Sequence, residues 1–131
     1  MNIKYLFPLF FFLFLTIGCK SSSKTEELDL ETISTLLDQG SVKIIDVRTQ
    51  EEYDEIHIPG AINYPIESLQ DSLSYLNQSE DIIVVCRTGN KSSQAKKLLK
   101  ENGFEKVHNG GKWQNVDEII KTKERNKPGN N

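Results

Sequence analysis

The stretch Asp81–Lys91, with the sequence DIIVVCRTGNK, decides the fold of this chain. Four consecutive β-branched apolar residues, IIVV, follow Asp81, which is typical of a strand that is buried on both faces. The residues after Cys86 are polar or small, which predicts a loop rather than a continued strand. The stretch therefore predicts a central strand that ends at Cys86 and leads into a loop.

Predicted helices and strands alternate on both sides of this stretch. Helices are predicted over residues 31–39, 51–56, 68–77, 91–102 and 113–121, with Asp29 as the N-cap of the first, and strands over residues 42–47, 61–63, 82–85 and 106–108, with a tight turn at Gly110-Gly111. This alternation indicates an α/β domain with a largely parallel sheet. Ligands bind at the carboxyl ends of the strands in such sheets, and Cys86 stands at such an end.

Cys86 is a candidate nucleophile because of the loop that follows it. Backbone N–H groups of residues 88–90 can point inward as an anion nest, and the predicted helix 91–102 adds the positive end of its dipole. Arg87 and Lys91 add positive charge nearby, which favours the reactive thiolate. Such a loop suits thiosulfate, a persulfide anion, phosphate or arsenate. The alternative is that Cys86 is an inert buried thiol that packs as a small hydrophobe.

Three groups of residues resemble the signatures of the rhodanese family. They are Asp46-Val47-Arg48 with Glu52-Tyr53 and the segment His57–Asn63; the loop Cys86–Ser92; and Gly103-Phe104, Val107, Gly110-Gly111 and Trp113. The resemblance implies a rhodanese-like α/β fold with a central, mostly parallel sheet of about five strands flanked by helices. This domain is expected to cover residues 28–121, and residues 122–131 are expected to be a flexible tail.

The same resemblance implies that the protein is a sulfurtransferase. In the family, the loop cysteine takes sulfane sulfur from a donor such as thiosulfate, carries it as a persulfide and passes it to cyanide or a thiol. The catalytic residue is then Cys86, no cofactor is needed, and the implied substrate-binding residues are Arg87, Thr88, Gly89, Asn90, Lys91 and Ser92. Arginine is frequent at the position of Lys91, so the resemblance does not extend to bidentate binding of the donor.

Four residues of the first signature are interpreted as structural support. Asp46, Arg48 and Glu52 are predicted to form a hydrogen-bonded network near the site, because buried charges are usually paired. His57 is predicted to bond to a loop backbone rather than to act as a base. No metal site is predicted, since the two histidines and one free cysteine lack the spacing of metal ligands.

The N-terminal segment has the features of a secretory signal. Residues 5–18 are apolar apart from Thr16, they follow Lys4, and they are fewer than the roughly 20 apolar residues that cross a bilayer. The stretch that ends in Cys19 resembles the lipobox of bacterial lipoproteins, although Thr16 stands where that family usually has leucine. The resemblance implies that Cys19 is lipidated and becomes the new N-terminus.

These features predict how the domain is attached. Residues 1–18 are expected to be a lipoprotein signal peptide, and residues 19–27 the lipidated Cys19 and a polar tether. The protein is then expected in the bacterial cell envelope, anchored in a membrane and facing the periplasm or the outside. The alternative is an uncleaved N-terminal membrane anchor. With Cys19 lipidated, Cys86 is the one free thiol and has no disulfide partner within the chain.

Charge and spacing limit the other function classes. The formal net charge is −3, and nothing in the sequence suggests binding of nucleic acid, which requires a basic face. A phosphatase or arsenate reductase is one rival, but those enzymes resemble the pattern Cys-x5-Arg, whereas position 92 is serine and the basic Lys91 comes one position earlier. A second rival is a non-enzymatic, membrane-tethered module that uses the fold for binding, or that carries a persulfide, without turnover, for a protein partner that the sequence does not specify.

Overall fold

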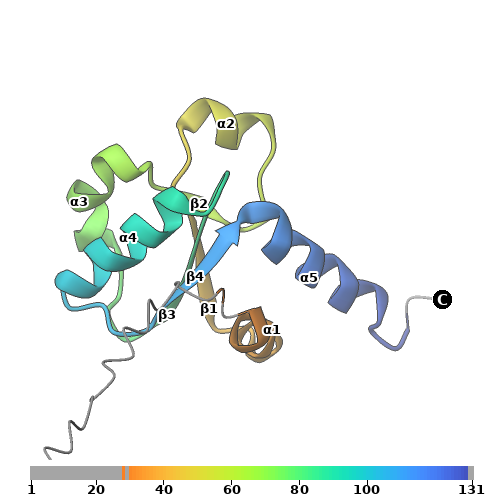
Figure 1. The fold of residues 1–131 in the computed structure, drawn as a ribbon. Coiled ribbons are helices and arrows are strands. Elements are labelled where there is room, and N and C mark those ends of the chain that lie inside the picture. The colour runs from red at the N-terminus through yellow and green to blue at the C-terminus, as the bar shows by residue number, and fades with distance from the viewer. Residues whose placement is uncertain (1–27, 29, 130–131) are drawn as a thin grey trace, which may run out of the picture.

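A parallel sheet of four strands is the centre of the domain (Figure 1). The computed structural model describes residue 28 and residues 30–129. Within them the strands are β1 (Val42–Asp46), β2 (Ile62–Asn63), β3 (Asp81–Cys86) and β4 (Val107–Lys112), in the order β2-β1-β3-β4. The predicted α/β fold with a parallel sheet is confirmed, with four strands in this part of the chain where about five were expected.

The strand β3 lies inside the sheet, as its run of apolar residues predicts. It pairs with β1 at five residue positions and with β4 at five. Its residues from Ile82 to Cys86 are all buried. Because successive side chains of a strand point to opposite faces, Val84 and Cys86 enter one apolar cluster, whereas Ile83 and Val85 enter the other. Cys86 is the last residue of this central strand.

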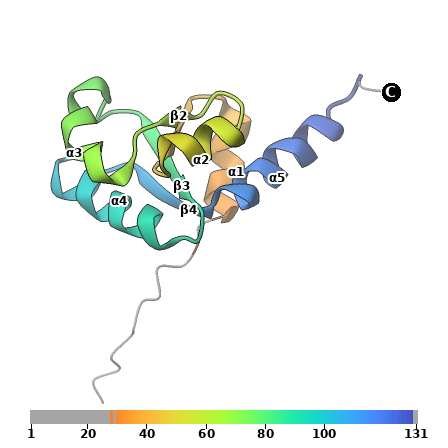
Figure 2. The ribbon, with the colours of Figure 1, turned by 90° about the horizontal axis from the view of Figure 1, so that it is seen from above.

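Helices cover both faces of the sheet (Figures 1 and 2). One face carries α1 (Leu30–Gln39) and α5 (Trp113–Arg125), and the other carries α4 (Asn90–Glu101) and α3 (Leu69–Ser72), which is flanked by the 3-10 turns η1 (Ile66–Ser68) and η2 (Leu73–Tyr75). The predicted helix 68–77 is thus divided into short pieces. The short α2 (Gln50–Glu55) follows β1 and stands at the same end of the sheet as the loop after β3 (Figure 1).

The predicted turn at Gly110-Gly111 is wrong, since both residues belong to β4. The register between β3 and β4 shifts so that Val84 faces Asn109 and Val85 faces Gly111, and Gly110 is passed over. A Cβ atom on Gly110 would lie 2.9 Å from methyl carbons of both Val85 and Val116. The glycine therefore allows a bulged strand to pack closely on the core, and it does not reverse the chain.

The final helix α5 continues past its predicted end at residue 121. Residues 122–125 are helical, so the expected flexible tail from 122 to 131 is wrong for these four residues. The ammonium of Lys123 lies 2.6 Å from a carboxylate oxygen of Asp38 in α1, which ties the last turns of α5 to the domain. This contact joins residues 85 positions apart, which explains why local sequence did not predict it.

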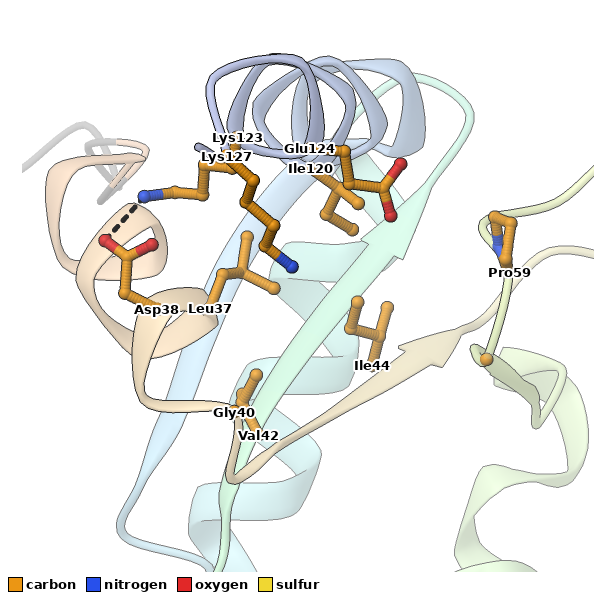
Figure 3. Close-up of a pocket in the computed structure, with 11 residues that line it drawn as sticks. Leu37, Asp38, Gly40, Val42, Ile44, Pro59, Ile120, Lys123, Glu124 and Lys127 are labelled. Atoms are coloured by element: carbon orange, nitrogen blue, oxygen red, sulfur yellow. Dashed lines mark hydrogen bonds and ion pairs between the residues drawn. The ribbon is translucent and has the colours of Figure 1, made fainter. Parts of the chain in front are cut away.

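A cavity of about 380 Å³ lies between α1, α5 and the start of β1 (Figure 3). Leu37, Ile44 and Ile120 contribute apolar side chains to it, and the Lys123–Asp38 ion pair lies at its rim. None of the residues that line it belongs to the loop 86–92.

The predicted attachment of the domain lies outside the described residues. The signal peptide and the lipidated Cys19 with its tether belong to this attachment. The predicted N-cap Asp29 also lies outside the described residues. Among the helices of the described part of the chain, none has the length and apolar character needed to cross a membrane.

Candidate active site

The side chain of Cys86 is held at the end of β3 by the loop that follows it. Its Sγ atom accepts hydrogen bonds from the backbone N–H groups of Gly89, at 3.0 Å, and Ser92, at 3.3 Å. The side chain is 1% exposed, and Cys86 is the one free cysteine in the described residues. The two N–H groups converge on one sulfur atom in the arrangement of an anion nest.

The conformation of Gly89 creates this arrangement. Gly89 has a φ of +101°, the left-handed region that glycine adopts without a steric penalty, and it is the N-cap of α4. Its carbonyl oxygen accepts hydrogen bonds from the hydroxyl of Ser92, at 2.9 Å, and from the N–H of Ser93, at 3.2 Å. These bonds join the loop to the first turn of α4. The N-terminus of that helix therefore faces the sulfur.

A cavity of about 680 Å³ opens in front of the sulfur atom. Its lining residues come from the end of β1, from α2, and from the loop and first turns after β3: Arg48, Thr49, Glu52, Cys86, Arg87, Thr88, Asn90, Lys91 and Gln94. Of the predicted substrate-binding residues, Arg87, Thr88, Asn90 and Lys91 line this cavity. The other two, Gly89 and Ser92, contact the sulfur instead.

Both exposed cations of this cavity have carboxylate partners. Arg87 lies 3.8 Å from Glu52, and Lys91 lies 3.0 Å from Glu67 in η1. The pKa of Glu67 is below its ordinary value, first because its carboxylate accepts a backbone hydrogen bond and then because it binds Lys91. Sequence reasoning missed Glu67, which is 24 positions from Lys91 and belongs to no local motif.

Asp46 and Arg48 form a buried ion pair beneath the cavity. The guanidinium of Arg48 donates hydrogen bonds to both carboxylate oxygens of Asp46, at 2.6–3.0 Å. Arg48 is 4% exposed and Asp46 is 0% exposed. Arg48 also donates to the carbonyl of Ile56 at 2.7 Å, and it lies 5.1 Å from the ring centroid of Trp113. The pair thus joins the end of β1 to the segment after α2 and to the start of α5.

Glu52 has different partners from those in the predicted network. Its carboxylate accepts the backbone N–H of Thr49 at 3.2 Å, while the Thr49 hydroxyl accepts the N–H of Glu52 at 3.3 Å. This capping box begins α2. The spacing Thr-x-x-Glu was readable in the sequence as an N-terminal helix signal, but it was not used there. Glu52 therefore connects the cap of α2 to Arg87.

His57 lies beside α2 and is not among the residues that line the Cys86 cavity. Its Nδ1 atom is 2.7 Å from the carbonyl oxygen of Tyr53, and the two rings stack at 3.9 Å. Its backbone partner is thus in a helix rather than in a loop. The described residues contain no group of three histidine, cysteine or acidic side chains that could hold a metal ion.

Comparison with known proteins identifies the kind of domain that builds this site. The sequence model of the rhodanese-like domain matches residues 29–111. The chain belongs to the rhodanese-like domain family. Its members include sulfurtransferases and sulfur carriers.

Two curated relatives of this rhodanese-like chain are bacterial. One is the putative sulfur carrier protein YrkF of Bacillus subtilis (strain 168), which is 34% identical over 91 residues, or 69% of this chain and 49% of that protein. The other is the thiosulfate sulfurtransferase PspE of Escherichia coli (strain K12), 36% identical over 69 residues, or 51% of this chain and 66% of that protein. The chain thus spans about half of the first relative and just under two thirds of the second.

Solved structures show the same rhodanese-like fold. The crystal structure of the Alr3790 protein from Anabaena sp. superposes with a TM-score of 0.61 at 34% identity, covering 70% of this chain and 73% of that one. The human single-domain sulfurtransferase TSTD1 superposes with a TM-score of 0.56 at 26% identity, covering 63% of this chain and 87% of that one.

Proposed function

We propose that this rhodanese-like protein is a sulfurtransferase that moves sulfane sulfur from an anionic donor such as thiosulfate to a thiol or cyanide, through a persulfide on Cys86. One observation carries the proposal: the Sγ atom of Cys86 accepts hydrogen bonds from two backbone N–H groups, beside a cavity lined by Arg87 and Lys91. Such preorganised donors stabilise negative charge on sulfur. The similarity to a thiosulfate sulfurtransferase supports the choice of donor.

In the first step, the thiolate of Cys86 attacks the outer sulfur atom of thiosulfate. A bond forms between Sγ and that atom, and the bond between the two sulfur atoms of thiosulfate breaks. Sulfite leaves with the electron pair of the broken bond, and Cys86 is left as a persulfide anion. Atoms and charge balance, since a thiolate and a thiosulfate dianion give a persulfide anion and a sulfite dianion.

In the second step, an acceptor attacks the outer sulfur of the persulfide. A thiolate acceptor becomes a persulfide, or cyanide becomes thiocyanate, and the electron pair of the broken S–S bond returns to Sγ. The N–H groups of Gly89 and Ser92 then stabilise the thiolate that leaves. Dividing the transfer into two displacements replaces one difficult step by two easier ones.

The proposal is tested by incubating the full-length protein with thiosulfate and measuring its mass. We expect a gain of one sulfur atom, which peptide mapping assigns to Cys86 and which is absent from the Cys86→Ser variant. Loss of the added sulfur on exposure to cyanide, with release of thiocyanate, checks the second step. An unchanged mass with thiosulfate and with small organic persulfides would refute sulfur transfer at this site.

Turnover distinguishes an enzyme from a sulfur carrier. The similarity to a putative sulfur carrier protein gives the carrier alternative specific support. An enzyme releases many equivalents of thiocyanate per Cys86 in excess thiosulfate and cyanide, whereas a carrier loads one sulfur atom and holds it until a protein acceptor arrives. Multiple-turnover release at a constant rate favours the enzyme, and loading of one sulfur atom without sustained release of thiocyanate favours the carrier.

Membrane attachment through Cys19 is a separate proposal, supported by the apolar segment 5–18 that precedes this cysteine. The lipidated Cys19 would then hold the domain in the bacterial cell envelope. Expression in a bacterial host with a labelled fatty acid tests this. We expect label on the wild-type protein and none on Cys19→Ala, and equal labelling of the two would refute lipidation at this residue.

A further inference from the structure

Each cation that lines the Cys86 cavity has a carboxylate partner. Arg48 is engaged by buried Asp46, Arg87 lies 3.8 Å from Glu52, and Lys91 lies 3.0 Å from Glu67. The formal charge of these three pairs is zero. Attraction of an anion to the sulfur therefore depends on the backbone N–H groups more than on the basic side chains, which a reading of the loop sequence alone would not indicate.

Glu67 is the one of these three carboxylates that is neither buried nor part of the capping box of α2. Asp46 is buried with Arg48, and Glu52 caps α2 through Thr49. Glu67 instead stands on η1 with its side chain 63% exposed, and its carboxylate pairs with the ammonium of Lys91. Its pKa is lowered by a backbone hydrogen bond and then by Lys91, so it is ionised at neutral pH.

We propose that Glu67 is a specificity-determining residue, which lowers the preference of the Cys86 site for dianionic donors by holding Lys91. The inference rests on the proposed sulfur transfer and refines its substrate class. Coulomb attraction scales with the charge of the ligand, so neutralising Lys91 weakens the binding of a dianion about twice as much as that of a monoanion. Holding Lys91 therefore shifts the selectivity of the site toward monoanionic donors, such as an organic persulfide or thiosulfonate, relative to thiosulfate.

Glu67→Gln tests this while keeping the shape of the side chain. The measurement is the rate of persulfide formation on Cys86 with thiosulfate, a dianion, and with methanethiosulfonate, a monoanion. Because the interactions of an exposed ion pair are weak, we expect a gain of about two- to five-fold with thiosulfate and a smaller gain with methanethiosulfonate.

Glu101→Gln is the matched control. Glu101 is on the same helix as Lys91 and forms an exposed pair with Lys97 at 3.9 Å, but it does not line the Cys86 cavity. This variant removes the same charge from the chain, so it measures the effect of net charge alone. Equal gains from the two variants, or a Glu67→Gln gain that is the same for both donors, would overturn the proposal.

A second measurement does not need sulfur transfer and so separates the two hypotheses. Alkylation of Cys86 by anionic iodoacetate and by neutral iodoacetamide is followed by peptide mass spectrometry on the full-length protein. Because iodoacetate carries one negative charge, we expect the ratio of the two rates to rise about 1.4- to 2.2-fold in Glu67→Gln, the square root of the gain for a dianion, and to stay constant in Glu101→Gln. An unchanged ratio in Glu67→Gln overturns the role of Glu67, whether or not the protein loads sulfur.

Discussion

The backbone N–H of Gly89 lies 3.0 Å from the Sγ atom of Cys86, and the left-handed conformation of Gly89, with a φ of +101°, puts it there. An L-residue pays about 1–2 kcal/mol to adopt such a backbone conformation. The geometry around the sulfur thus depends on a residue that contributes no side chain.

Gly89→Ala is expected to destabilise the domain by about 1–2 kcal/mol and to slow persulfide formation on the order of ten-fold or more, because the N–H that stabilises the thiolate shifts. Gly60→Ala is the matched control, since Gly60 also has a positive φ, +83°, and an added Cβ there meets no atom within 4 Å. Unfolding in urea and thiosulfate loading are measured on both. Similar loading rates in the two variants would mean that the Gly89 N–H is dispensable.

Arg48→Met is expected to cost about 3–5 kcal/mol of unfolding free energy, because it leaves the Asp46 carboxylate buried without its ionic partner. Adding Asp46→Asn should recover part of this loss, since the uncompensated charge is then removed. Lys97→Met provides a baseline, because it breaks an exposed pair and should change stability by less than about 1 kcal/mol. Additive losses in the Asp46–Arg48 double-mutant cycle would contradict coupling between the two residues.

Gly110→Ala is expected to cost about 1–3 kcal/mol by overpacking the core, because the new methyl group would lie 2.9 Å from Val85 and Val116 methyl carbons. Combining it with Val116→Ala makes room for the methyl group. The double variant should therefore lose less stability than the sum of the single variants, as measured by urea unfolding. If the stability losses of the two single variants simply add in the double variant, β4 has moved away from α5 instead.

Stability is expected to fall as the pH drops below about 4.5. The pKa of Glu118 is lowered from 4.5, mainly by its hydrogen bond to Arg125, and the pKa of Glu67 is lowered as well. A carboxyl whose folded-state pKa is depressed contributes stability above its unfolded pKa, and this contribution is lost as the pH falls through the folded value. Glu118→Gln should lower the stability of the domain at pH 7 and have little effect on it near pH 3. Urea unfolding at the two pH values measures both.

Sequence patterns sufficed for the parts of the fold that local residues determine. The apolar run 82–85 predicted β3, and the apolar stripe of residues 91–102 predicted α4, which spans Asn90–Glu101. The polar residues after Cys86 predicted a loop there, and the cysteine was therefore expected at the end of a strand. Each of these signals lies within a short window, where side-chain periodicity and backbone preference act directly.

The parts that sequence did not predict depend on contacts between distant residues. Lys91 was expected to bind the donor, and its ion pair with Glu67 became visible only with the fold. The bulge at Gly110 depends on the packing of Val85 and Val116 against it. Glu52 is a different case, because its capping box with Thr49 was encoded locally and the network prediction overlooked it.

The position of Cys86 on β3 has a consequence for how the protein loses activity. Central strands that are hydrogen-bonded on both sides exchange their amide protons only when the whole domain opens, whereas peripheral segments open locally. The reactive sulfur is attached to such a strand, and Ser92 connects it to the first turn of α4. Fraying of α1, α2 or the end of α5 should therefore leave the sulfur in place, so that heat inactivation follows global unfolding and not an earlier local transition.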